Sequence, residues 1–510
     1  MNRLTRNLLS IFALISSLFI ATSCGDDATE DVPTGKRTTI VTRSSSIKEG
    51  AEVDAATVTK ITISYNTTVT QAADANITLN GVKVVGQKGT TTAMDMDIMV
   101  TLEEGKEYTL IIPEGSVVST TDANQTAPEF VLHFSTKKSL EDSLPDNEAM
   151  AVTRMLGFGW NLGNHFDSHS NGNKCNWWDN VNTTEALYQN LAQAGVKTVR
   201  IPATWGPWQG EAPDYKIEDS FMATIKENVL WAKAAGLNVI LNSHHDEYWQ
   251  NAYSASTNTE TNEALKARIV ATWKQIAEEF KNEGDYLILE AFNELNNNWA
   301  VPTNGELKIM NEWNQLVVNT IRATGGNNAT RWISVPSYQA SPTYALDSRF
   351  TIPTDDANKL IVAVHCYDPY NFTLNKEKLA ETWGHSAGNA NDEKSITTLL
   401  NKLKETFIDK NIPCYLGEIG CSIHETELGN KCRDYYLEYF CRAAHYAGLA
   451  VTLWDNHSPG AGAEHHNYFS HKDGSWMNDS ESLIKTMIKA TTSTDPTYTL
   501  ESIYNRAPKK

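Results

Sequence analysis

The chain has 510 residues, of which 41% are hydrophobic and 21% charged, which excludes wholesale disorder, collagen and a multi-span membrane protein. Lys and Arg number 43 against 62 Asp and Glu, so the net charge is −19 and neither nucleic acid nor an anionic lipid surface is an expected partner. The length leaves room for roughly two to four domains.

The first 23 residues have the pattern of an export signal. Two arginines precede an apolar run over 8–21, which is short for a membrane span. Three small residues then precede Cys24, an arrangement that resembles the lipidation site of bacterial lipoproteins, and acidic residues follow. We predict a signal peptide over 1–23, lipidation of Cys24, a tether over 24–36 and export as an outer-membrane lipoprotein exposed at the cell surface. A plain secretory signal is the alternative.

Residues 37–138 have the alternating apolar pattern of short antiparallel strands separated by turns. We expect an all-β Ig-like sandwich similar to the domains that precede bacterial catalytic modules. A spacer is the favoured role and a sugar-binding module the alternative. The predicted strands are 60–65, 77–79, 98–102, 108–112 and 130–134.

Strands alternate with helices over residues 139–510, which predicts a (β/α)8 barrel. An open doubly wound sheet is the alternative, but no glycine-rich phosphate motif opens the first helix. The predicted strands are 158–162, 198–201, 238–242, 287–292, 332–335, 360–365, 414–418 and 451–454, and the predicted helices are 184–194, 220–235, 263–281, 312–323, 396–409 and 431–447.

Polar or aromatic side chains follow seven of these eight strands. In a (β/α)8 barrel the carboxyl ends of the strands carry the chemistry, so seven such ends together indicate a site. The candidates are Asn161, Asn164, Arg200, Asn242, His244, His245, Asn293, Glu294, His365, Tyr367, Glu418, Trp454, Asp455 and Asn456.

Glu294 and Glu418 follow the fourth and seventh strands, so we expect their carboxyl groups to face each other across the barrel mouth. Cleavage of a glycosidic bond needs two such groups, one to protonate the leaving oxygen and one to attack the anomeric carbon or activate water. Their pKa values must differ. Arg200 is the candidate to keep one of them ionised, and Trp454 could stack on a sugar ring.

The adjacent His244 and His245 raise the question of a metal site. Neighbouring side chains at a strand end point in opposite directions, so we expect these two not to bind one ion. We expect no metal and no cofactor in this chain.

The motifs over residues 157–476 resemble glycoside hydrolase family 5, whose members are retaining (β/α)8 enzymes that act mostly on β-1,4-linked glucans and mannans. The resemblance rests on the order and spacing of seven motifs, at 159–164, 199–205, 239–245, 292–294, 364–372, 416–420 and 453–456. The wider sequence is most similar to the endoglucanase and xyloglucanase branch.

This resemblance implies that Glu418 is the nucleophile and Glu294 the acid/base, with carboxyl groups roughly 5–5.5 Å apart. The implied substrate is cellulose, xyloglucan or mixed-linkage β-glucan. We expect the protein to be a monomer. A β-mannanase and a non-catalytic glycan-binding lipoprotein are the alternatives. The residues implied to bind or position substrate are Asn164, Arg200, His244, His245, Asn293, His365, Tyr367 and Trp454, and further loop tryptophans that could contact sugar or simply pack are Trp177, Trp178, Trp208, Trp249, Trp299 and Trp383.

Overall fold

The computed structural model describes residues 37–53, 55, 58–103, 105–136, 144–169 and 177–510. The predicted signal peptide, the tether and Cys24 lie outside these residues. The chain divides into two compact units, Met1–Ser139 and Leu140–Lys510. Among the described residues, no helix combines the length and the apolar character that crossing a membrane requires.

The described part of the first unit consists of short strands in three sheets. Their orders are β2-β4-β9-β8, β3-β13-β10-β6-β7 and β1-β12-β11-β5, an all-β arrangement consistent with the predicted sandwich. The strands are β1 Arg37–Thr38, β2 Thr42–Ser45, β3 Ala51–Val53, β4 Lys60–Tyr65, β5 Val69–Gln71, β6 Thr78–Leu79, β7 Val82–Lys83, β8 Gly86–Lys88, β9 Asp95–Met99, β10 Glu107–Ile112, β11 Val117–Ser119, β12 Gln125–Thr126 and β13 Phe130–Thr136.

One predicted strand of this unit is wrong: the strand expected over 98–102 is β9, Asp95–Met99. Two buried aspartates lie in it, and charged residues are usually exposed. Asp97 accepts hydrogen bonds from Lys60 Nζ at 2.7 Å and Thr62 Oγ1 at 2.6 Å, and Asp95 accepts one from Ser64 Oγ at 2.7 Å. These partners on β4 satisfy the carboxylates inside the sheet.

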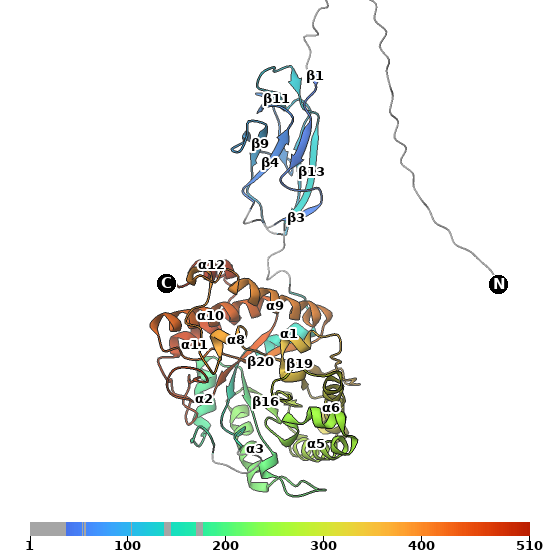
Figure 1. Ribbon diagram of the computed structural model, residues 1–510, viewed down its shortest axis with the longest axis vertical. Coiled ribbons are helices and arrows are strands. Elements are labelled where there is room, and N and C mark those ends of the chain that lie inside the picture. Colours follow the sequence, from blue (N-terminus) through green and yellow to red (C-terminus); the bar gives the residue numbers. More distant parts are fainter. Residues whose placement is uncertain (1–36, 54, 56–57, 104, 137–143, 170–176) are drawn as a thin grey trace, which may run out of the picture. The chain divides into compact units, whose positions relative to one another are not determined.

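The second unit is a closed barrel of eight parallel strands, which confirms the predicted (β/α)8 fold. All the strands are buried on both faces, as parallel strands covered by helices must be. Figure 1 shows the helices packed around them. The strands are β14 Phe158–Leu162, β15 Thr198–Ile201, β16 Asn238–Asn242, β17 Leu287–Glu290, β18 Ile333–Pro336, β19 Leu360–Cys366, β20 Cys414–Ile419 and β21 Ala450–Asp455.

Helix α1 precedes β14, the other helices follow the barrel strands, and the four-residue α7 is the only α-helix between β18 and β19. Several begin earlier than the apolar periodicity indicates. The helices are α1 Glu148–Leu156, α2 Glu185–Ala194, α3 Asp219–Ala234, α4 Ala252–Thr257, α5 Thr259–Phe280, α6 Asn304–Ala323, α7 Pro342–Ala345, α8 Tyr370–Thr373, α9 Asp392–Thr406, α10 Glu427–Tyr446, α11 Glu481–Thr492 and α12 Leu500–Tyr504.

Helix α1 packs beneath the amino ends of the barrel strands. Its Val152 and Leu156 belong to one buried cluster with Ile240, Ile361 and other strand residues. Thr198 Oγ1, at the start of β15, donates to the Leu156 carbonyl at 2.6 Å. The helix therefore covers the end of the barrel opposite to the strand ends that bear the candidate site.

Candidate active site

The centre of the candidate site is the buried guanidinium group of Arg200, on β15. Its Nη1 donates to Glu418 Oε1 at 2.8 Å and to Asn161 Oδ1 at 3.0 Å. Its Nη2 donates to Asn293 Oδ1 at 2.8 Å, and Nε and Nη2 both donate to Glu290 Oε1, at 2.9 and 2.7 Å. One side chain thus fixes groups from three other strands: Asn161 on β14, Glu418 on β20, and Glu290 and Asn293 at the end of β17 and just after it.

Glu294 and Glu418 lie together at the barrel mouth. An oxygen of each carboxyl group and a ring nitrogen of His365 all lie within 4.8 Å of one another. His365 Nδ1 is 2.7 Å from Glu294 Oε1 and 3.6 Å from Glu418 Oε1. Tyr367 Oη donates to Glu418 Oε2 at 2.9 Å. Glu418 is therefore held on both oxygens, whereas Glu294 has His365 as its neighbour.

The pKa values of these groups follow from their burial and their partners. Burial raises the pKa of Glu294 to about 8, which keeps its carboxyl group protonated at neutral pH. Burial also raises the pKa of Glu418, but His365 and Arg200 oppose that rise. Burial lowers the pKa of His365 to about 4, so its ring is neutral. The two carboxyl groups are thus in unequal environments, as acid and nucleophile roles require.

An irregularity in β20 directs Glu418 into the mouth. The pairing of β20 with β21 shifts register between Leu416 and Ile419, and the pairing with β19 shifts near His365, which lies opposite Glu418. Such bulges re-aim side chains next to active sites. Gly417 precedes Glu418, and a Cβ at this glycine would lie 3.0 Å from His365 Nε2. The strand therefore leaves room for the histidine ring.

Trp454 and His244 form a second group at the mouth. The two rings are nearly parallel, at 10°, with centroids 6.2 Å apart. A Cβ at Gly163 would lie 2.7 Å from two carbon atoms of the Trp454 ring, so only glycine leaves the ring in place. Asn242 Nδ2 lies 3.1 Å from His244 Nδ1 and fixes that imidazole.

His244 and His245 do not point apart, so this prediction is wrong. Ring nitrogens of both residues and a carboxyl oxygen of Asp167 lie within 4.8 Å of one another. Strand β16 ends at Asn242, so strand alternation no longer governs the next residues. These atoms are potential metal ligands, as are those of Glu294, His365 and Glu418. Burial raises the pKa of Asp167 to about 7, and its Oδ1 has no hydrogen-bond partner among the described residues.

Asn164 is placed differently from the other candidate residues. It lies in the turn after β14 with φ of +57°, and its backbone N–H donates to Asp167 Oδ2 at 3.1 Å. Its carbonyl accepts hydrogen bonds from Ser168 Oγ and from the Asp179 N–H, both at 3.0 Å. These contacts make Asn164 part of the turn that positions Asp167.

A buried histidine connects the segment after β14 to the end of β21. His471 Nδ1 lies 2.8 Å from Asp179 Oδ2, and its Nε2 lies 3.5 Å from Asp455 Oδ1. His165 Nδ1 lies 2.7 Å from the same Asp179 oxygen. Burial disfavours charge on His471, but the two carboxylates raise its pKa to about 9. Asp455 also accepts a hydrogen bond from Trp160 Nε1 at 3.0 Å.

Sequence reasoning missed Glu290 and Tyr415 as members of the site. Glu290 is fully buried and accepts hydrogen bonds from Arg200, from Asn242 Nδ2 at 3.1 Å and from Tyr415 Oη. Burial acts to raise the pKa of Glu290, but Arg200 and its other partners hold it below the ordinary value. The available signal was a glutamate inside the otherwise apolar strand predicted over 287–292. A buried carboxylate needs a charged or hydrogen-bonding partner, so such a residue points to a second polar group nearby.

The loop tryptophans divide into packing and exposed residues. Trp383 is buried, and Trp177 and Trp208 pack around Phe221. Trp178 and Trp299 are exposed by 45% and 57%.

Comparisons with known proteins agree with this geometry. The family model "Cellulase (glycosyl hydrolase family 5)" matches residues 162–460. Endoglucanase B of Neocallimastix patriciarum is 37% identical over 319 residues, which are 60% of this chain and 64% of that protein. The chain thus spans less than two thirds of this relative. A xyloglucan-specific endo-β-1,4-glucanase of Bacteroides ovatus is 31% identical, covering 70% of this chain and 78% of the relative.

Solved structures give the same result. The GH5-4 broad specificity endoglucanase from Bacteroides salanitronis is 39% identical, with a TM-score of 0.65, and the match covers 69% of this chain and 97% of that one. A Bacteroidetes-affiliated GH5 cellulase has a TM-score of 0.67 at 32% identity, over 71% of this chain and 98% of that one. The family model covers more than half of the chain, and the chain therefore belongs to glycosyl hydrolase family 5.

Proposed function

We propose that the protein is a retaining endo-acting hydrolase of β-1,4-linked glucans. The observation that carries this proposal is the pairing of Glu294 and Glu418, whose closest carboxyl oxygens lie within 4.8 Å. Retaining enzymes hold their two carboxyl groups roughly 5–5.5 Å apart, whereas inverting enzymes leave room for a water between them. The short separation favours direct attack on the sugar.

In the proposed reaction the Glu418 carboxylate attacks the anomeric carbon while Glu294 gives its proton to the leaving oxygen. A covalent glycosyl–enzyme forms, and Glu294, now ionised, takes a proton from the water that hydrolyses it. Arg200 and Tyr367 hold the two oxygens of Glu418 in place for the attack. Asn293 Oδ1 is fixed by Arg200, which orients its amide nitrogen as a donor to a sugar hydroxyl.

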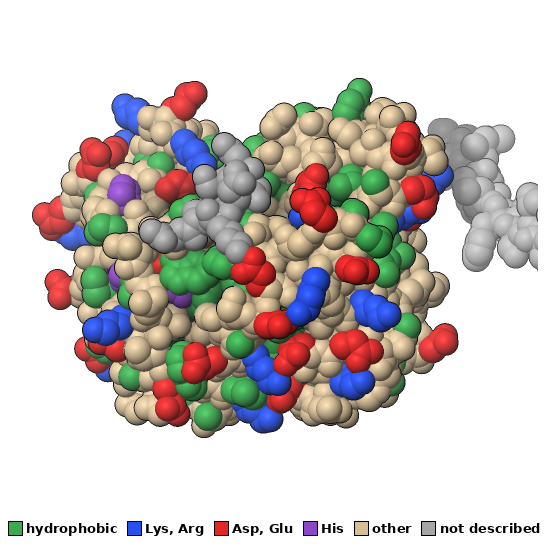
Figure 2. All heavy atoms as spheres, turned by 90° about the horizontal axis from the view of Figure 1, so that it is seen from below, with side chains coloured by type: hydrophobic (Ala, Val, Ile, Leu, Met, Phe, Trp, Pro, Cys, Tyr) green, Lys and Arg blue, Asp and Glu red, His purple; other side chains and the backbone are tan. Residues whose placement is uncertain are grey.

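A neutral glucan fits the surroundings of these carboxyl groups. Trp454 offers an apolar ring beside them, and uncharged imidazoles and amides supply hydrogen bonds. On the face shown in Figure 2, acidic side chains are interspersed with lysine and arginine, which suits a neutral polymer better than a polyanion. The relatives named as endoglucanases and as a xyloglucan-specific glucanase support the same substrate class.

The test is release of reducing sugar from carboxymethylcellulose, xyloglucan, mixed-linkage β-glucan and mannan, with Glu418→Ala as the blank. We expect release from at least one of the three glucans and a fall of at least about a thousandfold in the variant, because the nucleophile is lost. Release from mannan alone would replace the substrate assignment. Activity of the variant equal to that of the parent would disprove the role of Glu418.

A further inference from the structure

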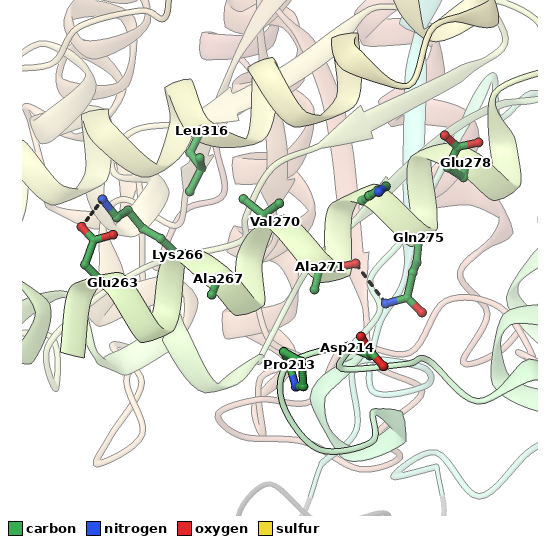
Figure 3. A pocket seen from close by; sticks show the side chains of 11 residues that line it. Pro213, Asp214, Glu263, Lys266, Ala267, Val270, Ala271, Gln275, Glu278 and Leu316 are labelled. Atoms are coloured by element: carbon green, nitrogen blue, oxygen red, sulfur yellow. Dashed lines mark hydrogen bonds and ion pairs between the residues drawn. The ribbon is translucent and has the colours of Figure 1, made fainter. Parts of the chain in front are cut away.

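Charged side chains on the surface of the catalytic unit pair with near neighbours. Figure 3 shows Lys266 paired with Glu263 beside a cavity of about 790 Å³ that lies along the outer side of α5. Water already solvates such groups, so a pair of this kind contributes little to stability and needs no functional explanation. Glu290 differs, because it is completely buried inside the barrel, where an ionised carboxyl group is costly unless its partners satisfy it.

The partner of Glu290 is Arg200, whose five N–H groups all have acceptors. Nε and one N–H of Nη2 donate to Glu290 Oε1, at 2.9 and 2.7 Å. The other donors reach Asn161 and Glu418 from Nη1, and Asn293 from Nη2. Because the guanidinium group is planar and rigid, an acceptor that fixes its Nε–Nη2 edge also fixes the direction of the remaining N–H groups.

The carboxyl group of Glu290 is itself held by two neighbouring side chains. Asn242 on β16 pairs in register with Glu290, and its Nδ2 donates to Glu290 Oε1 at 3.1 Å. Tyr415 on β20 donates from Oη to the other oxygen, Oε2. Tyr415 belongs to the buried cluster that includes residues of α1, so packing fixes its ring. The carboxyl group therefore cannot turn without losing these hydrogen bonds.

Stability alone does not explain the buried pair of Glu290 and Arg200. Apolar side chains of similar volume often stabilise a core as well as a buried ion pair does, because removing two charges from water is costly. The geometry supplies another reason for the pair. Glu290 and Glu418 bind different edges of the same guanidinium group, so a displacement at Glu290 is transmitted to Glu418.

We propose that Glu290 is a positioning residue for the nucleophilic attack. With Tyr415 as its anchor, Glu290 orients Arg200 so that the guanidinium group holds the Glu418 carboxylate and the Asn293 amide in place. This proposal rests on the function proposed above. It gives Glu290 no contact with the sugar and no proton transfer, so loss of the acceptor at this position should slow the attack without loosening the substrate.

Glu290→Met and Glu290→Gln form a matched pair for the test. Both side chains are close to glutamate in length, but only glutamine keeps an acceptor oxygen for Arg200. The substrates are soluble mixed-linkage β-glucan and dinitrophenyl β-cellobioside, whose leaving group departs without protonation. We expect Glu290→Met to lower kcat/KM on both substrates by about a hundredfold, mainly through kcat, and Glu290→Gln to stay within about tenfold of the parent.

Two outcomes would overturn the positioning role. Parent-like kinetics in Glu290→Met, with thermal melting showing that the variant is folded, would leave Glu290 a packing role only. A loss on the glucan alone would place the effect on protonation by Glu294, because the dinitrophenyl substrate needs no acid. A parent enzyme that cleaves neither substrate would instead refute the proposed function.

Tyr415→Phe is a milder variant that removes only the hydroxyl group. We expect kcat/KM to fall about three- to tenfold, with no further loss when the substitution is combined with Glu290→Met, because Tyr415 acts through Glu290. If Glu290→Met does not fold, parent-like kcat/KM in Tyr415→Phe overturns the proposal. Tyr338→Phe is the control: Tyr338 Oη also donates to a buried glutamate, Glu306, at 2.8 Å, but that glutamate is not an acceptor of Arg200, so kcat/KM should be unchanged.

Discussion

The two carboxyl groups at the barrel mouth differ in what surrounds them. Glu418 accepts hydrogen bonds from Arg200 and Tyr367, whereas Glu294 has His365 beside it and lies close enough to Glu290 and Glu464 for their charges to raise its pKa further. Identical side chains thus acquire the two roles of the reaction from their positions alone.

The pH dependence of the reaction tests this difference. A general acid acts only while protonated, and the pKa of Glu294 is raised to about 8. We therefore expect kcat/KM on a soluble β-glucan to hold up to neutral pH and to fall as the pH rises through about 8. The measurement is a profile of kcat/KM from pH 5 to pH 10.

Glu464→Gln provides the matched comparison for this profile. The charge of Glu464 contributes to the raised pKa of Glu294, so removing it should move the descending limb to lower pH. A limb that already falls near pH 5 in the parent would contradict the assignment of the acid.

Arg200, Glu294 and Glu418 were identified from the sequence, but Glu290 was not: it ends β17 in the structure, whereas it lay inside the longer strand predicted over 287–292. Glu294 and Glu418 are recognisable because each follows an apolar run, and Arg200 because it interrupts one near its end. Glu290 was not, because its acceptability depends on Arg200, which is 90 residues away along the chain. Local pattern carries no information about such a partner.

The barrel strands were predictable to within one or two residues because each is a continuous apolar run. The first residues of the helices were predicted less accurately than the strands. Helix α6 begins at Asn304, not at 312, because Thr303 and Glu306 form a reciprocal capping box. Helix α5 likewise begins at Thr259, where Asn258 accepts from the Thr261 N–H. The caps fix where these helices begin, and in α6 the apolar spacing also continues back to Leu307 and Met310, which are buried.

Gly163, in the turn after β14, lies directly against the Trp454 ring, so a larger residue at this position should disturb the ring. In Gly163→Ala the new Cβ would lie 2.7 Å from the Trp454 ring and from the Asp455 carbonyl oxygen. We expect the ring to be displaced, with kcat/KM reduced about tenfold or more and a stability cost of about 1–3 kcal/mol. Kinetics and thermal unfolding measure the two effects.

Gly284→Ala is the control for this substitution. Its Cβ would meet only Tyr286 Cδ1 at 3.8 Å, which is ordinary contact, so activity should be unchanged. Parent-like kinetics in Gly163→Ala would show that the position of the Trp454 ring does not limit the reaction.

The buried imidazole of His471 links the first and last strands of the barrel, because it contacts Asp179 in the segment after β14 and Asp455 at the end of β21. The groups that face it are Asp179, Asp455, His165 and His457, whose ring stacks on it at 4.7 Å. Its pKa is raised to about 9 from an ordinary value near 6.5. Its contribution to the free energy of unfolding is therefore complete below about pH 6.5 and is lost as the pH rises through 9.

Denaturant unfolding at a series of pH values from 6 to 10 tests this contribution. The parent should lose stability over the upper part of this range, and His471→Asn should be less stable at pH 6 with a weaker dependence on pH. Parallel curves for the two proteins would show that His471 is not charged in the folded state.

Strand β14 pairs with β21, and Trp160 reaches Asp455 across 295 positions of the chain. A ribosome adding about 5–20 residues per second needs roughly 15 to 60 s to make that interval. During this interval β14 has been synthesised but β21 has not, so one edge of the growing sheet has no hydrogen-bonding partner strand. The nascent chain must be kept from associating through that edge until its last strand emerges.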